Sequence, residues 1–245
     1  MLQLFRRLAL ASCLIGLSAC ASSGIPSDAK TTVLSFEDLD CSSCGDTMAR
    51  ELIQVDGVYK TAFNKRKAEL TVIADPTVHV LAIAEKKKPA EEEWKVTLGA
   101  GKGRYKAWES APQGADVQQV AKNGEDVADL TPHIAKGKVT IVDFSAPWCE
   151  PCRELDAYIV ERLKVRKDVA YRKLDIGDWD TPLAKRFMKE AKELPFVIVY
   201  DKNGNRFASL SGLDTNRLDE TLVKAGSVID DAPPSTEAAP ATKNP

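Results

Sequence analysis

Apolar and polar positions along the first hundred residues predict a small mixed unit of strands and helices. Short apolar and β-branched runs predict strands at 31–36, 58–63, 70–73 and 94–98. Helical spacing of apolar residues predicts one helix after the first strand, ending at Gly57, and a second that begins at Asp75-Pro76. The predicted order is βαββαβ, a split-βαβ arrangement typical of ferredoxin-like folds.

The second half of the chain predicts a separate α/β unit over 124–226, after a polar and poorly periodic stretch at 106–123 that we expect to be a linker. The run Lys138–Phe144 (KVTIVDF) is predominantly apolar with one acid inside it, which indicates a strand covered on both faces. The remaining predicted elements are a helix at 127–134, a helix starting near Pro151, strands at 169–176, 196–200 and 206–210, and a last helix ending at Gly226.

The first twenty residues have the layout of a secretory signal, with two arginines followed by an apolar stretch too short to span a membrane. Leu17-Ser18-Ala19-Cys20 resembles the lipobox of bacterial lipoproteins. That resemblance implies removal of residues 1–19, lipidation of Cys20 and an extracytoplasmic protein anchored to a bacterial membrane; Ala21 favours the outer membrane, facing the periplasm. The alternative is an ordinary signal peptide with an incidental cysteine.

Small and polar residues at 20–30 suit a tether between an anchor and a folded unit. The end of the chain, 227–245, is rich in Pro, Ala and Thr, and we predict that it is disordered. A formal net charge of -2 gives no concentrated basic surface, so we expect no nucleic-acid partner.

The chain has six cysteines. Cys13 would leave with the signal and Cys20 would carry lipid, so that two C-x-x-C pairs remain, Cys41/Cys44 and Cys149/Cys152. Disulfides can persist outside the cytoplasm, which makes redox chemistry possible at both pairs.

The second pair has the arrangement that disulfide exchange requires. Cys149 is expected at a helix N-terminus, where unsatisfied amides and the helix dipole favour a thiolate nucleophile. Cys152 follows about one turn later and could attack a mixed disulfide formed on Cys149. A lone C-x-x-C could equally be half of a zinc site, so its surroundings decide.

Three separated stretches, VDFSAPWCEPC, KLDIGDWD and ELPFVIVYDKNG, occur in the order found in the thioredoxin family, which residues 124–226 resemble. The resemblance implies a thioredoxin fold and protein thiol or disulfide clients, with no cofactor for the redox step. It also implies roles for individual residues: Cys149 attacks, Cys152 resolves, Pro195 is a cis-proline that presents the substrate strand, Asp143 and Lys173 assist proton movement, and Trp148 precedes the nucleophile. Ser145 departs from the tryptophan that many thioredoxins carry there.

Glu150 bears on the direction of the reaction, because an acid between two thiols disfavours thiolates. A less stable reduced form means a more reducing couple, and the C-E-P-C sequence also resembles extracytoplasmic reductases of the cytochrome c maturation type. We therefore expect a reductase.

The first pair lies between a predicted strand and helix, in Leu39-Asp40-Cys41-Ser42-Ser43-Cys44. Residues 31–105 resemble the heavy-metal-associated domain, which implies that Cys41 and Cys44 bind Cu(I) or another soft metal. Leu39 departs from the usual methionine. Three alternatives stay open: a disulfide that relays electrons to the second unit, a metal-recognition module that delivers it to a metalloprotein, or a structural remnant.

Together these features predict two α/β (α+β) domains in a membrane-anchored thiol-disulfide oxidoreductase with an accessory metal-binding unit. The alternative is a copper or heavy-metal binding and transfer protein whose thioredoxin-like unit maintains client thiols or docks to a partner.

Overall fold

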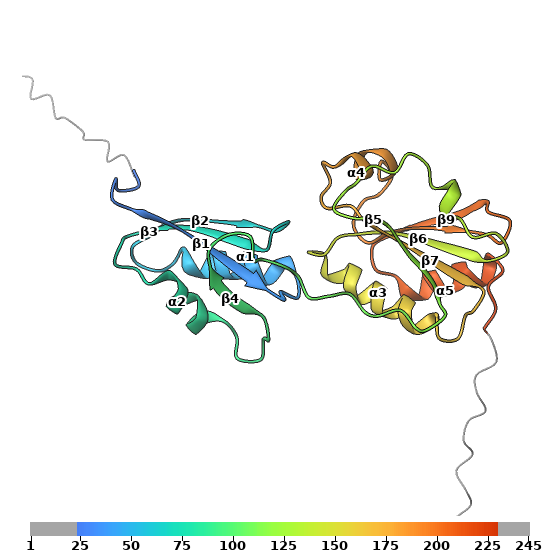
Figure 1. Cartoon of the computed structure of the whole chain (residues 1–245), viewed down its shortest axis with the longest axis horizontal. Helices are drawn as coiled ribbons and strands as arrows, with labels where there is room; N and C mark the ends of the chain where they lie inside the picture. The colour runs from blue at the N-terminus through green and yellow to red at the C-terminus, as the bar shows by residue number, and fades with distance from the viewer. Residues whose placement is uncertain (1–23, 230–245) are drawn as a thin grey trace, which may run out of the picture.

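A computed structural model describes residues 24–229 as two α/β units joined by a packed connecting segment (Figure 1). The predicted lipid signal with Cys20, and the predicted tail from residue 230 onward, lie outside the described residues. Within 24–229, no helix has the length and apolar character needed to cross a membrane.

The first unit contains a four-stranded antiparallel sheet and two helices. Its elements are β1 (Lys30–Glu37), α1 (Ser42–Leu52), β2 (Val58–Asn64), β3 (Glu69–Ala74), α2 (Val80–Lys87) and β4 (Lys95–Leu98). The predicted order of elements is therefore found, with strand order β2-β3-β1-β4 in the sheet. Apolar residues of both helices, such as Met48 and Ala84, pack with strand residues such as Phe36 and Val72 in one core.

The helix that follows the first cysteine pair lies very close to this sheet. A Cβ atom added at Gly45 of α1 would stand 2.2 Å from the Phe63 ring of β2. Any larger residue at this position would have to displace the Phe63 ring, so Gly45 lets α1 pack this closely on the sheet.

The second unit is a five-stranded mixed sheet with helices on both faces. Its elements are β5 (Asp116–Ala121), the 3-10 turn η1 (Thr131–His133), β6 (Val139–Ser145), α3 (Glu150–Arg162), β7 (Val169–Asp175), α4 (Pro182–Phe187), β8 (Phe196–Tyr200), β9 (Arg206–Ser211) and α5 (Thr215–Lys224). The strand order is β5-β7-β6-β8-β9, with β5, β7 and β6 parallel and β8 and β9 antiparallel.

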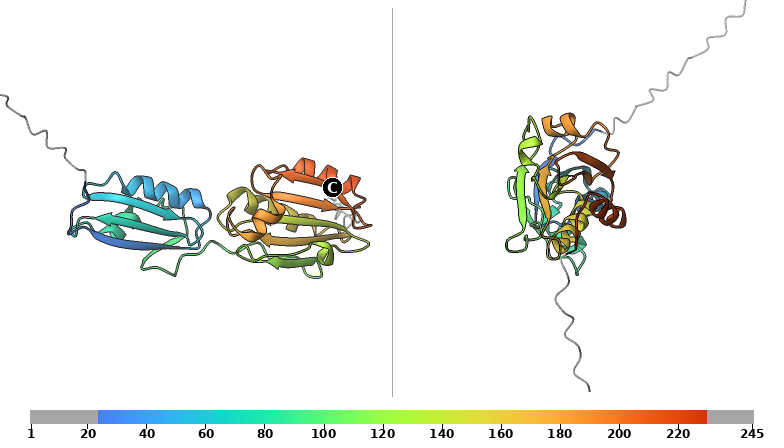
Figure 2. Two further views of the ribbon diagram at one scale, coloured as in Figure 1. Left: turned by 90° about the horizontal axis from the view of Figure 1, so that it is seen from above. Right: turned by 90° about the vertical axis from the view of Figure 1, so that its right-hand side faces the viewer.

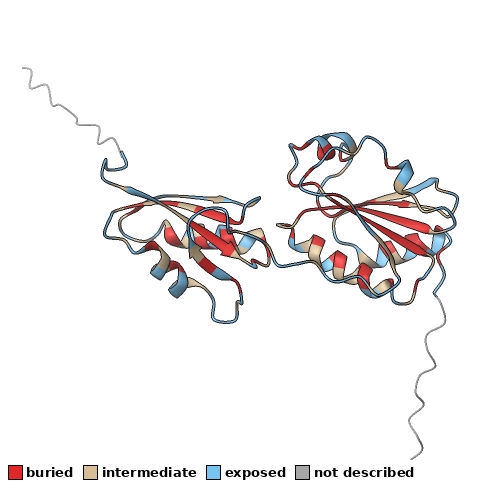
Figure 3. Cartoon of the chain, viewed as in Figure 1, coloured by how far each residue is buried: buried red, intermediate tan, exposed pale blue. Residues whose placement is uncertain are grey.

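The central strand of this sheet is β6, all seven residues of which are buried (Figure 3). Its alternating side chains enter two cores. Phe144 packs with Leu183 of α4 on one face, and Ile141 packs with Leu155 of α3 and Leu218 of α5 on the other. A strand covered on both faces was predicted from its apolar run, and the C-terminal end of this strand leads directly to the second cysteine pair.

Two predictions in this unit are wrong. Residues 116–121, predicted as linker, form the edge strand β5, which pairs with β7 and leaves the polar side chains of Gln118 and Gln119 exposed. The helix predicted at 127–134 is reduced to the three-residue turn η1. There the Asp129 carboxylate accepts hydrogen bonds from the backbone and hydroxyl of Thr131, and Pro132 supplies no N–H, so a longer helix is not favoured.

The connecting segment, residues 99–115 between β4 and β5, is hydrogen-bonded to both units. Its Lys106 N–H donates to the Leu39 carbonyl at 3.0 Å, and the Leu39 N–H donates to the Arg104 carbonyl at 3.1 Å. On the other side, Arg153 of α3 donates to the Lys106 carbonyl and Trp108 packs against the core of the second unit. The two units lie end to end along the molecule, with this segment running between them (Figure 2).

Candidate active site

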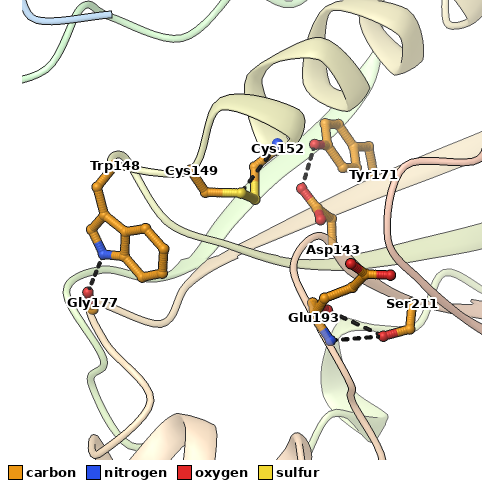
Figure 4. Close-up of a disulfide and its surroundings, with 8 residues drawn as sticks. All are labelled: Asp143, Trp148, Cys149, Cys152, Tyr171, Gly177, Glu193 and Ser211. Carbon is orange, nitrogen blue, oxygen red and sulfur yellow. Dashed lines mark hydrogen bonds between the residues drawn. A yellow bond between two sulfur atoms is a disulfide. The ribbon is translucent and has the colours of Figure 1, made fainter. Parts of the chain in front are cut away.

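The second cysteine pair forms a disulfide at the N-terminus of α3 (Figure 4). Cys149 is the N-cap residue, and its Sγ accepts a hydrogen bond from the Cys152 N–H at 3.2 Å. Cys149 is 5% exposed and Cys152 is fully buried, so Cys149 carries the sulfur nearer the surface. Glu150 follows it as an exposed residue of the first helical turn. Attack by Cys149 and resolution by Cys152 stay predictions, and the exposures place Cys149 where a client sulfur would arrive first.

The indole of Trp148 is fixed beside this disulfide. Its Nε1 donates to the Gly177 carbonyl at 2.7 Å, which ties the residue before the nucleophile to the loop that follows β7 (Figure 4). Gly177 has φ of 65°, a backbone conformation that favours glycine.

The loop before β8 contains a cis peptide bond between Leu194 and Pro195, as the resemblance implies. Ser211 of β9 holds this loop: its hydroxyl donates to the Glu193 carbonyl at 3.1 Å and accepts from the Glu193 N–H at 3.2 Å. The Gly212 N–H also donates to the Pro195 carbonyl at 2.9 Å. The clamp from β9 was not predicted, because only the strand pairing of β8 with β9 places Ser211 next to the loop.

Beneath the disulfide lies Asp143, which is fully buried on β6. Its Oδ2 is 2.8 Å from the Tyr171 hydroxyl, which in turn is 2.9 Å from Oδ1 of Asp156 on α3. A tyrosine hydroxyl has one proton to donate, so both contacts are hydrogen bonds only when one of the two carboxyl groups is itself protonated. Burial, with a smaller contribution from the Asp156 charge, raises the pKa of Asp143 to about 7, against the opposing effect of the Tyr171 hydrogen bond. Asp143 is thus able to gain and lose a proton near neutral pH.

Lys173 approaches this group from β7 and forms its ion pair with Asp156. Its Nζ lies 2.5 Å from Oδ1 of Asp156, whereas its charge acts on Asp143 only at longer range. Asp143 Oδ1 and Asp156 Oδ2, both buried, have no hydrogen-bond partner among the described residues. Each is therefore an oxygen that could take up a proton without breaking an existing hydrogen bond.

Sequence reasoning missed Tyr171 and Asp156, although both left a signal. Tyr171 lies two residues before Lys173 on one strand, and hence on the same face of the sheet. Asp156 is a single acid on the face of α3 that also carries Leu155 and Ile159, four residues after Cys152.

Comparisons with known proteins agree with this geometry. The profile of the thioredoxin family matches residues 125–224. Thioredoxin H5 of Arabidopsis thaliana is 30% identical over 92 residues, which span 38% of this chain and 75% of that protein. An H-type thioredoxin of Fagopyrum esculentum is 36% identical over 88 residues, covering 36% of this chain and 70% of the relative. The chain belongs to the thioredoxin family. A thioredoxin of Gallus gallus is 28% identical over 105 residues, which span 42% of this chain and 96% of that protein.

The second unit is therefore a thioredoxin unit, and the protein is a thiol-disulfide oxidoreductase that acts on protein thiols and disulfides. The disulfide, the cis-proline and the buried acid lie together at the end of β6 in this unit.

The first cysteine pair is at the N-terminus of α1. Cys41 is the N-cap residue, and its Sγ lies 3.9 Å from that of Cys44; both are free thiols. Cys41 is buried and Cys44 is half-buried. Burial, together with the nearby Cys41, raises the pKa of Cys44 to about 12. Two half-buried acids near this pair, Glu92 and Asp40, raise the pKa of Cys44 further, whereas the acids beneath Cys152 are fully buried.

The two C-x-x-C motifs lie next to each other in the structure. Cys41 and Cys149 line the same cleft of about 500 Å³, and the Ser42 N–H donates to the Trp148 carbonyl at 3.2 Å. The residue after one cysteine is thus hydrogen-bonded to the residue before the other.

Proposed function

We propose that this protein is an extracytoplasmic thiol-disulfide reductase, anchored through Cys20 to a bacterial membrane, with the outer membrane favoured. The observation that carries the reductase function is the Cys149–Cys152 disulfide lying above Asp143, a buried acid able to exchange a proton near neutral pH. The proposed location rests on the signal-like sequence and on the lipobox resemblance alone.

The reduced form would act in two steps. The Cys149 thiolate attacks one sulfur of a client disulfide, which forms a mixed disulfide and releases the client's other sulfur as a thiolate. Cys152 then gives its proton to the Asp143 carboxylate and attacks Cys149, which releases the second client thiol and forms the Cys149–Cys152 disulfide. Tyr171 and Asp156 would position Asp143 and adjust its readiness to accept that proton. The client gains two electrons and two protons.

Two measurements test this function. The protein should reduce insulin disulfides when an external dithiol regenerates it, and the Cys149/Cys152 couple should be reducing. A potential near the roughly -120 mV of a dedicated disulfide donor would contradict a reductase and favour an oxidase.

The anchor is tested separately. The chain expressed in a bacterium should be found in the membrane fraction, with a mass at its N-terminus that fits a lipidated Cys20. The Cys20→Ser variant should lose that mass and fractionate with soluble protein. Recovery of the wild type and the Cys20→Ser variant in the same soluble fraction would contradict the lipid anchor and favour an ordinary signal peptide.

We further propose that the first unit is ferredoxin-like, resembles the heavy-metal-associated domain and binds Cu(I) or another soft metal, which would make metalloproteins possible clients. The Cys41 and Cys44 sulfurs are 3.9 Å apart, less than twice a metal–thiolate bond of about 2.3 Å, so both could reach one ion. Residues 24–229 contain no group of three or more His, Cys, Asp or Glu side chains placed to hold a metal, so the ligands offered here are these two sulfurs.

Cu(I) titration under reducing conditions tests the metal proposal. The Cys149→Ser/Cys152→Ser chain should take up one equivalent of Cu(I), whereas the matched Cys41→Ser/Cys44→Ser chain should lose that site. Equal uptake by both chains would remove the metal function from the first unit.

A further inference from the structure

We propose that Cys41 and Cys44 are an internal redox partner of the thioredoxin unit, and that Cys41 exchanges directly with Cys149. The inference rests on the thiol-disulfide function proposed above and names the partner of that same site. It follows from how the first unit lies on the face that carries Cys149.

Each cysteine pair opens a helix, and the N-termini of those two helices face one another. Cys41 caps α1 and Cys149 caps α3. The backbone hydrogen bond from Ser42 to Trp148 joins residues directly adjacent to these two cysteines. Since a residue extends the chain by only about 3.3–3.6 Å, a bond between the neighbours brings the two cysteines themselves close.

Cys41 and Cys149 are each only 5% exposed, although both line the shared cleft. The side walls of the cleft include Trp148, Pro151 and Leu194, which belong to the surface around the disulfide. The first unit thus covers the surface where the sulfur of a client protein would have to arrive. The first unit therefore occupies the position that a client protein would take, with the Cys41 thiol at the cleft.

Charged side chains hold the first unit in this position. Lys65, in the turn after β2, lies 4.0 Å from the centroid of the Trp148 ring and pairs with Asp178 at 3.2 Å. Arg66 pairs with Asp180 at 3.8 Å, although both side chains are largely exposed and this pair contributes little. Lys65 therefore contacts both the residue before the nucleophile and the loop that fixes its indole.

The connecting segment holds the same arrangement from the opposite side. It pairs with Leu39, two residues before Cys41, through a bridge to Tyr105. It then accepts hydrogen bonds at Lys106 and Ala107 from Arg153, the residue after Cys152. One short segment thus binds next to both cysteine pairs.

The two thiols of the first pair are not equivalent in this arrangement. Cys41 faces the shared cleft, whereas Cys44 lines a different cavity of about 150 Å³, formed with Met48, Glu92 and Trp94 inside the first unit. Cys41 is therefore placed to attack, and Cys44, whose sulfur is 3.9 Å away, is placed to resolve.

The exchange balances without any further reactant. Cys41 sulfur attacks Cys149 sulfur, so that the Cys149–Cys152 bond breaks and Cys152 leaves as a thiolate that takes up a proton. Cys44 sulfur then attacks Cys41, which frees Cys149 as the second thiolate. Two electrons and two protons pass from Cys41 and Cys44 to Cys149 and Cys152, and the reverse path runs through the same mixed disulfide.

Trapping the mixed disulfide tests the proposal on the full chain, with Cys13→Ser and Cys20→Ser in every variant so that no other thiol remains. The Cys44→Ser/Cys152→Ser chain keeps Cys41 and Cys149; the matched Cys41→Ser/Cys152→Ser chain keeps Cys44 and Cys149. Both are oxidised with diamide, and the disulfides are identified by mass spectrometry of unreduced peptides. We expect an intrachain Cys41–Cys149 bond that forms at least about tenfold faster than any Cys44–Cys149 bond, at a rate independent of protein concentration.

Equal rates in the two chains, or disulfides that form only between chains as concentration rises, would overturn the proposal. If neither chain folds, the same bond can be sought in wild-type protein by acid quenching during its reduction. Insulin reduction by the wild type is scored separately. Fast trapping without insulin reduction would contradict the reductase function alone, and insulin reduction without preferential trapping would contradict the internal exchange alone.

Discussion

The two C-x-x-C motifs are built alike in the backbone and differently in what lies under them. In each, the first cysteine follows a strand and caps a helix. Beneath Cys152 the thioredoxin unit places the buried group of Asp143, Tyr171 and Asp156, whereas Cys44 is backed by the apolar core to which Met48 belongs. The acids near the first motif, Asp40 and Glu92, are only half-buried, in contrast to the fully buried Asp143 and Asp156.

This difference shows that the motif alone does not determine its chemistry. A helix N-terminus can present a sulfur, but turnover on a disulfide also needs a group that accepts and returns a proton near working pH. On this basis we expect the thioredoxin unit to turn over clients and the first unit to exchange with one fixed partner or to hold a metal.

The strongest way to break this comparison is to remove the proposed nucleophile. Cys149→Ser should lower insulin reduction by at least about 10³-fold, because Cys152, the thiol that remains above the buried acids, is fully buried and cannot meet a client disulfide. An exposed residue of β4, Lys95→Gln, is the control and should retain the wild-type rate. Substantial residual activity in the Cys149→Ser chain would mean that Cys41 or Cys44 turns over clients unaided.

Asp143→Asn tests the acid that distinguishes the two sites. The pKa of Asp143 is raised from 3.8 to about 7 in the folded protein, so between those pH values the folded state holds one proton more than the unfolded state. The free energy of unfolding therefore falls as pH rises from about 4 to about 7 and stays lowered above it. Relative to wild type, the variant should gain about 2–4 kcal/mol at pH 8 and nothing below pH 4, measured by urea denaturation.

Although Asp143→Asn should gain stability, its insulin-reducing activity should fall. Cys152 loses its proton acceptor, so the mixed disulfide should resolve more slowly. Asp126→Asn is the matched control, because Arg186 lowers the pKa of this exposed carboxyl. It should show no gain in stability above pH 7. A gain of equal size in both variants would contradict the explanation that burial of Asp143 causes the stability difference.

Tyr171→Phe sharpens the comparison by leaving both acids in place. Loss of a buried hydrogen bond should lower the free energy of unfolding by about 1–3 kcal/mol. The Tyr171 hydrogen bond lowers the pKa of Asp143, so its removal should move the rise of activity with pH to a higher pH. Tyr158→Phe, whose hydroxyl donates to Asp219 away from the disulfide, should leave the pH profile unchanged. Identical profiles for both variants would contradict a role for Tyr171.

The smallest expected effect concerns the contact between the units. Lys65→Gln removes the cation over Trp148 and the pair with Asp178, which contribute about 0.5–1 kcal/mol to docking. A bulky external thiol should then reduce the Cys149–Cys152 disulfide a few-fold faster. Lys60→Gln, on the exposed side of β2, is the control. Unchanged access in the Lys65→Gln chain would show that the connecting segment alone holds the units together.

Much of the fold could be predicted because its elements have strong local signals. β6 is marked by its apolar run, and β1 and β3 by alternating apolar and polar residues. These patterns can be seen in the sequence because buried positions are occupied by apolar residue types. The edge strand β5 could not be predicted in the same way, since an edge strand leaves polar residues such as Gln118 and Gln119 exposed and resembles a linker.

Site residues could be predicted where a short sequence motif identifies them. Contacts between residues far apart in the sequence could not be predicted. Cys149, Cys152 and the cis-Pro195 could be named from the sequence. The pairing of Lys173 with Asp156 instead of Asp143 depends on how α3 lies across β7, which no spacing along the chain reveals.

The hydrogen bond between Ser42 and Trp148 has a consequence for clients. A partner tethered to the same chain is present at an effective concentration on the order of millimolar, whatever the amount of protein in the compartment. A free client at micromolar levels would therefore have to bind about a thousandfold more tightly than the first unit does, or arrive when the cleft is open. Selectivity would then come less from the shape of the thioredoxin surface than from which proteins outcompete its own neighbour.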